Sequence, residues 1–88
     1  IERDVRAAMG DLRNAYRSLQ LAERSAELAG QRVELGQEKF RLGAISFTDL
    51  QRFIDDAARE ERAAVDARFA LINALIAVER HVGGTVRP

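Results

Sequence analysis

Apolar and small residues recur along the first half of the chain at alternating steps of four and three positions. The repeat comprises Ile1, Val5, Ala8, Leu12, Ala15, Leu19, Ala22, Ala26, Ala29, Val33, Gly36 and Phe40. An apolar period of 3.5 residues sustained over this length predicts an α-helix that contacts a second helix along a left-handed seam. Every second seam position from Ala8 to Gly36 is Ala or Gly, so we expect a close approach of the two helices. Of the glycines inside this helix, Gly36 alone lies on the seam and has an evident packing reason.

A second apolar row runs beside this repeat. It consists of leucines spaced seven residues apart, one position before the small residues: Leu21, Leu28, Leu35 and Leu42. The row widens the apolar face of the helix. We therefore expect the first helix to touch more than one neighbour.

The second half of the chain repeats the pattern and predicts a second helix. Its positions are Phe47, Leu50, Ile54, Ala57, Glu61, Ala64, Arg68, Leu71, Leu75, Val78 and Val82. Glu61 and Arg68 interrupt the repeat, and a neighbouring row carries the apolar surface there, namely Ala58, Val65, Phe69, Ile72 and Ile76. Two interpretations stay open: a stutter in an ordinary coiled coil, or a helix that serves two partners.

The residues between the two halves predict a tight turn. Gly43 suits the position just after a helix, where the backbone adopts a positive φ. Ser46 followed by Asp49 forms a capping box, and Ile45 with Leu50 forms a hydrophobic staple. The first helix should therefore end just before the glycine, and the second should begin just after the serine.

Together these patterns predict an all-α fold, a long antiparallel helical hairpin with helices at about 2–42 and 47–82 and a turn at 43–46. The linker is so short that the helices must run antiparallel. The Gly83-Gly84 pair should end the second helix, and Pro88 should prevent it from resuming. The whole chain is expected to be this one hairpin.

Composition narrows the possible partners. The chain is 47% apolar and 32% charged with one Pro and no Trp, which is typical of helical and coiled-coil proteins. Fourteen acidic and fourteen basic residues balance, so no field of one sign attracts nucleic acid. The absence of Cys excludes disulfides and thiolate metal sites, and no apolar run approaches the roughly 20 residues of a membrane span. The start at Ile1, without a targeting signal, suggests a piece of a longer protein.

The residues capable of chemistry do not form a catalytic set. His81 has no Cys or second His to complete a metal site or a triad. The adjacent carboxylates at 55–56 and 60–61 point about 100° apart on a helix, so neither pair converges on one proton or metal. The aromatic residues lack the dense interleaving of basic residues that a stacking surface for nucleic acid needs, and no glycine-rich phosphate loop is present. We expect no enzyme activity, no cofactor and no metal, and interpret the chain as a structural and docking element.

The turn and its flanks resemble a known family. The segment from Phe40 to Gln51, with Leu42-Gly43 before the turn and Thr48-Asp49 after it, looks like the periplasmic tip of the outer membrane factor family. These are the TolC-like channels of tripartite efflux pumps and type I secretion systems. Residues 70–84 are similar to the family's return helix and its Gly-rich break, and residues 5–42 to its descending helix. The resemblance covers nearly the whole chain.

The resemblance implies a fold context and a function. In that family each protomer contributes two such hairpins, and three protomers close a periplasmic tunnel below an outer-membrane β-barrel. This chain would be one hairpin of that wall, in the periplasmic part of an outer-membrane protein, and its tip would dock the α-hairpin of the periplasmic adaptor. The residues that match the docking tip are Leu42, Gly43, Ala44, Ile45, Ser46 and Thr48.

Two further residues match positions near the constriction that gates the family's tunnel, namely Phe40 and Asp49. Ile45 and Arg52, however, stand where one repeat of the family has Arg and Asp, so the closing salt bridges of that repeat are not expected here. By resemblance the full-length protein would be a trimer. Apart from the resemblance, the apolar surface exceeds what one antiparallel helix covers, so the isolated hairpin should self-associate as a dimer or a larger helical bundle.

Two other interpretations remain. The α-hairpin of the periplasmic adaptor also carries Arg, Leu and Ser at seven-residue intervals, which Arg32 and Ser46 fit, although Lys39 occupies the Leu position. Adaptor hairpins tend to return into a lipoyl-like β segment, whereas here Val82 is followed by Gly83-Gly84. The third interpretation is a helical-hairpin dimerisation module with no role in transport. The sequences that flank the hairpin would separate the three.

Overall fold

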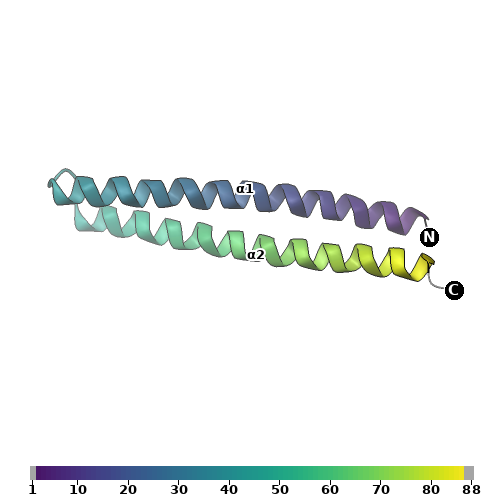
Figure 1. The fold of residues 1–88 in the computed structure, drawn as a ribbon. Helices are drawn as coiled ribbons and strands as arrows, with labels where there is room; N and C mark the ends of the chain where they lie inside the picture. The colour runs from purple at the N-terminus through teal and green to yellow at the C-terminus, as the bar shows by residue number, and fades with distance from the viewer. Residues whose placement is uncertain (1, 87–88) are drawn as a thin grey trace.

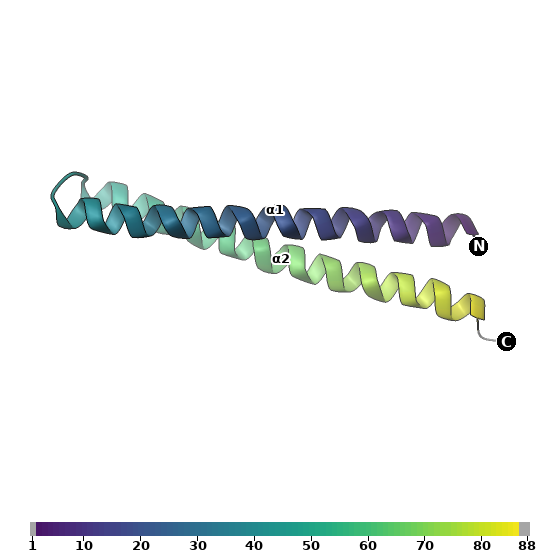
Figure 2. The same ribbon diagram turned by 45° about the horizontal axis from the view of Figure 1, so that its top comes forward.

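The computed structural model describes residues 2–86, which form two long helices joined by a short turn. Helix α1 spans Glu2–Arg41 and helix α2 spans Phe47–Val86, each of 40 residues. The helices lie side by side and antiparallel, with both termini at one end, the base, and the turn at the other end, the tip (Figure 1). They cross at a shallow angle (Figure 2), and the molecule measures 68 × 13 × 13 Å. The predicted all-α hairpin is confirmed.

Helix α1 ends in a Schellman motif. Gly43 has a φ of 77°, the left-handed conformation predicted for it. The Ala44 amide donates a hydrogen bond to the Lys39 carbonyl at 2.8 Å, and the Gly43 amide donates to the Phe40 carbonyl at 3.0 Å. These two bonds occupy carbonyls that would otherwise have no partner at the helix end. The helix stops at Arg41, one residue before the predicted end.

Helix α2 begins with the predicted cap. The Asp49 amide donates to the Ser46 hydroxyl at 3.1 Å, and the Leu50 amide donates to the Ser46 carbonyl at 3.2 Å. The Asp49 carboxylate lies in the first turn, where it suits the positive end of the helix dipole. Leu50 is buried and Ile45 half-buried, so both residues of the predicted staple are withdrawn from solvent.

Replacing Gly43 by Ala should lower the free energy of unfolding by about 1 kcal/mol, because an L side chain is strained at this φ. A Cβ at this position would meet no atom within 4 Å, so the loss is one of backbone conformation and not of packing. Gly43→Asn should lose less, since Asn tolerates the left-handed region better. Thermal unfolding followed by circular dichroism measures both variants. An Ala variant as stable as the parent would contradict the assignment.

The contact between the helices is a seam of mostly small residues. On α1 it follows the predicted repeat, whose members from Val5 to Gly36 are all buried or half-buried. On α2 the buried and half-buried positions at steps of three and four are Leu50, Phe53, Ala57, Glu60, Ala64, Ala67, Leu71, Ala74 and Val78. The hydrophobic core is therefore made of Ala8, Ala29, Leu50 and Ala64. Small side chains on both helices let the two backbones approach closely.

One of the two rows predicted for the α2 seam is wrong. Every seventh residue from Leu50 to Val78 lies on the seam as predicted, but the other row is shifted by one residue. The seam uses Phe53, Glu60, Ala67 and Ala74, whereas the predicted row of Phe47, Ile54, Glu61, Arg68, Leu75 and Val82 is exposed. The shifted row includes two alanines, and it places Phe53 against Gly36 of α1. It also makes the repeat continuous, so the α2 seam contains no stutter.

Gly36 has the packing role predicted for it. A Cβ there would lie 2.7 Å from Cδ2 of Phe53 and 3.4 Å from Cδ1 of Leu50. The glycine thus makes room for two of the largest side chains on the seam. Gly10 and Gly30, by contrast, have no atom within 4 Å of such a Cβ.

The structure differs from the prediction near the ends of both helices. Helix α2 continues through Gly83-Gly84 to Val86, so the predicted stop at residue 82 is wrong. Two glycines lower helix propensity by up to about 1 kcal/mol each, but neither removes a hydrogen-bond donor, so the helix continues. Phe40, the last predicted seam residue of α1, is exposed. Ile1 and Pro88, predicted to start the repeat and to block the second helix, lie outside the described residues.

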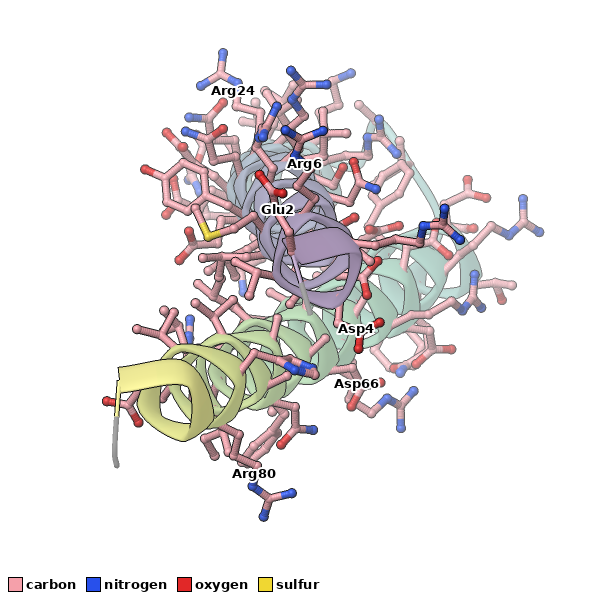
Figure 3. All side chains as sticks on the ribbon, turned by 90° about the vertical axis from the view of Figure 1, so that its right-hand side faces the viewer. Glu2, Asp4, Arg6, Arg24, Asp66 and Arg80 are labelled. Atoms are coloured by element: carbon pink, nitrogen blue, oxygen red, sulfur yellow. The ribbon has the colours of Figure 1, made fainter. Side chains whose placement is uncertain are left out.

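Most charged side chains are exposed. Viewed along the hairpin from the base, Arg6 and Arg24 project from α1 away from α2, and Arg80 projects from α2 away from α1 (Figure 3). Most ion pairs of the described residues join neighbours within one helix: Arg6 with Glu2, Arg24 with Glu27, Arg41 with Glu38, and Arg59 with Asp56. The Arg68 guanidinium lies 3.5 Å from the Glu23 carboxylate across the two helices. Because both side chains are more than half exposed, this pair adds little stability.

Candidate functional site

The tip is the segment from Leu42 to Thr48, and it presents an exposed, uncharged surface. Five of the six residues predicted to dock an adaptor are exposed, and Ile45 is half-buried. Leu42 is 67% exposed. The Schellman motif and the Ser46 cap hold the backbone of this segment from both sides.

An aromatic pair joins the last turn of α1 to the first residue of α2. The rings of Phe40 and Phe47 are 5.9 Å apart between centroids and inclined at 59°, a geometry in which aromatic pairs attract. The heptad pattern predicts both residues on the seam and does not predict their contact. The available signal is that Phe40 lies in the last turn of the first helix and Phe47 begins the second. Of the two candidate gate residues, Phe40 belongs to this pair and Asp49 is half-buried in the first turn of α2.

The described part of the chain offers contact surfaces more than chemistry. Between residues 2 and 86 no group of three or more His, Cys, Asp or Glu side chains is arranged to hold a metal ion. No helix in that range is long and apolar enough to cross a membrane. What distinguishes the surface is its exposed apolar area, since fifteen large hydrophobic side chains among residues 2–83 are at least 37% exposed. Exposed apolar side chains mark interaction sites where they form contiguous surface.

Two rows account for much of this area away from the tip. The Leu row on α1 consists of Leu21, Leu28, Leu35 and Leu42, exposed by 46% to 70%. The outer α2 stripe consists of Val65, Phe69, Ile72 and Ile76, exposed by 40% to 62%. Both rows were expected from the sequence, and neither is covered within the hairpin.

One lateral side of the hairpin has an apolar groove near the base. This base groove has a volume of about 440 Å³ and is lined by Met9, Leu12, Arg13, Tyr16, Leu71 and Leu75. The Glu23–Arg68 ion pair lies on the same side, because these residues are seven positions from Tyr16 and Leu75 respectively and so share their faces. Ile72 is three residues from Leu75, so the outer α2 stripe borders this side.

The opposite lateral side has a charged groove of about 360 Å³. Its lining residues are Ser25, Leu28, Ala29, Arg32, Asp56, Arg59 and Glu60. Ser25 is two residues from Glu23 and therefore points about 160° away from it around α1. Because Leu28 lines this groove, the Leu row belongs to this side. The two lateral sides of the hairpin thus carry different apolar rows.

Comparison with protein-family models, with curated proteins and with solved structures finds no match for the chain.

Proposed function

We propose that this hairpin forms part of the wall and the tip of the periplasmic tunnel of an outer-membrane channel, in a tripartite efflux pump or a type I secretion system. The observation that carries the proposal is the pair of lateral sides with different apolar rows beside an exposed, uncharged tip. A unit that contacts one neighbour through one side and a second neighbour through the other forms a heterologous contact, which closes into a ring when the rotation allows it.

The positions of the exposed residues fit such a wall. If neighbouring hairpins point the same way, α1 of one lies beside α2 of the next and runs antiparallel to it. Residues at equal distances from the turn then lie at the same height along the two helices. Leu42 therefore lies beside Phe47 of the neighbour, and Leu35 lies beside Ile54 of the neighbour. All four side chains are exposed in the single hairpin, and burying them supplies the free energy that the small seam lacks.

The surface of the tip fits docking to the α-hairpin of a periplasmic adaptor. Leu42, Gly43 and Ala44 carry no charge, and Ser46 and Thr48 add side chains with hydroxyl groups to the tip. Gly43 leaves open space where a side chain would stand, so the backbone of an opposing tip can come close. On this proposal the hairpin has no catalytic role, and the energy for transport comes from other components. Phe40 and Asp49 remain the candidate gate residues.

Ala44→Trp in the full-length protein is expected to abolish cross-linking to the adaptor and to reduce export at least tenfold, because the bulk blocks contact between tips. Ala44 is a better site than Gly43, since the positive φ is confined to the glycine and a variant there combines strain with bulk. Gln31→Trp, at an exposed position far from the tip, is the matched control. Cross-linking and export at parental levels in the Ala44 variant, with the protein present in the membrane, would rule the proposal out.

A further inference from the structure

The outer α2 stripe has the form of a second coiled-coil seam. Its four residues follow steps of four, three and four, and the same steps continue outward to Arg62 and Ala58 on one side and to Glu79 and Gly83 on the other. The stripe is exposed along its whole length. A repeat of this period on an uncovered face indicates contact with another helix.

A hollow of about 90 Å³ lies on the stripe. It is lined by Val65, Arg68, Phe69 and Ile72. These residues occupy positions i, i+3, i+4 and i+7 of one helix, the set of four that receives a single knob in a coiled coil. The hollow therefore suits one aliphatic side chain from a facing helix.

The charges beside the stripe indicate that the facing helix is a second copy of α2. Arg62 stands three residues before Val65, and Glu79 stands three residues after Ile76. When two copies pack antiparallel, Val65 faces Ile76 of the second copy and Arg62 faces its Glu79. Parallel packing would instead set Arg62 against Arg62 and Glu79 against Glu79, which is unfavourable.

We propose that the outer α2 stripe is a homodimer interface in which the α2 helices of two copies pack antiparallel about a two-fold axis between Ala70 and Leu71. Phe69 then faces Ile72 of the second copy, and each Ile72 enters the hollow of the other copy. The contact uses the same surface on both chains, so it closes at two copies. At each end of the interface, Arg62 of one copy lies opposite Glu79 of the other.

This inference is independent of the proposed function. In a channel wall a neighbouring hairpin would lie on this side, so the homodimer is the state of the hairpin outside such a wall. Loss of adaptor docking leaves the dimer untouched, and a failure of the dimer leaves the wall proposal untouched.

Charge reversal tests the pairing. Arg62→Glu and Glu79→Arg should each weaken self-association of the 88-residue chain about tenfold, since each change creates two like-charge contacts per dimer. The double variant should return to the parental dissociation constant. Sedimentation equilibrium at low salt measures all three, with Arg17→Glu on α1 as the control that leaves association unchanged. Single variants without effect, or a double variant no tighter than either single one, would overturn the antiparallel pairing.

Replacing apolar residues by glutamate tests which surface forms the dimer interface. Phe69→Glu should abolish the dimer, whereas Leu28→Glu, the same kind of change in the Leu row, should leave it intact. Circular dichroism establishes that both variants remain helical. A parental chain that stays monomeric at millimolar concentration, or a dimer lost in Leu28→Glu and kept in Phe69→Glu, would overturn the assignment of the interface.

A distance measurement tests the orientation. The chain has no Cys, so a spin label at Arg52→Cys is unique, and Arg52 is exposed and lies outside the stripe. With the two-fold axis between Ala70 and Leu71, the two labels should be about 55 Å apart at 1.5 Å per residue. A parallel dimer would bring them within about 25 Å, and that result would exclude the proposed arrangement.

Discussion

Ala64→Leu is expected to lower the free energy of unfolding of the hairpin by about 2–3 kcal/mol, the upper part of the range of roughly 1–3 kcal/mol that extra volume costs in a close-packed contact. Ala64 is 4% exposed and lies midway along the α2 seam, where the helices approach closely because the residues are small. A leucine there must separate the helices or adopt a strained rotamer, although leucine itself is a good helix former.

Ala63→Leu is the matched control for this variant. Ala63 is exposed, so the same substitution one residue away should change stability by no more than about 0.5 kcal/mol. Urea unfolding followed by circular dichroism should be measured at one fixed protein concentration, because self-association adds to apparent stability. Equal effects at both positions would show that the seam is not where the structure places it.

Gly36→Leu is expected to be similarly damaging, by about 2 kcal/mol or more, because its Cβ alone would lie 2.7 Å from Cδ2 of Phe53. Gly30→Leu provides the contrast. A Cβ at position 30 would meet nothing within 4 Å, so that variant should gain up to about 1 kcal/mol from helix propensity. The difference between the two glycines isolates packing from backbone entropy.

The contact with Phe53 can be tested by a double-mutant cycle. Phe53→Ala removes the ring that a side chain at position 36 would meet, so Gly36→Leu should cost less in that background than in the parent. We expect a coupling energy of at least about 1 kcal/mol between the two sites. Additive effects would show that the leucine is accommodated without moving Phe53, contrary to the geometry.

These effects are large because the core of the hairpin is small. Among residues 2–83, the buried hydrophobic residues are three alanines and one leucine, and an alanine methyl contributes far less than the roughly 1.5–3 kcal/mol of a buried leucine. Long helices of this kind depend on packing for most of their stability. The exposed rows on both lateral sides are therefore the natural source of further stability, through contact with other helices.

Local features of the turn could be read from the sequence in advance. Gly43, Ser46 and Asp49 act through backbone conformation and hydrogen bonds within a few residues, so their identity is sufficient to predict them. The α1 seam was also predictable, because its Ala and Gly positions alternate with larger residues over the whole helix. The row of leucines on α1 was recognised as a separate surface for the same reason.

The α2 seam was not predictable in the same way, because α2 has two apolar faces of similar strength. Pattern alone favoured Ile54 and Leu75 over Ala67 and Ala74, since the larger residues are more hydrophobic. Which face of α2 is buried depends on α1, because the small residues of its seam allow the two helices to approach closely. The sequence predicts the end of α2 too early, because the Gly83-Gly84 pair weakens a helix without preventing one.

By itself, the sequence determined that this chain forms two long helices, where it reverses, and which face of α1 meets its partner, since these follow from short-range hydrogen bonding and from a 3.5-residue repeat. Only the tertiary structure decided which face of α2 is buried and which is left exposed, because that choice depends on how closely two backbones can approach. It thereby placed the Leu row and the outer α2 stripe on opposite sides of the hairpin, available to different neighbours.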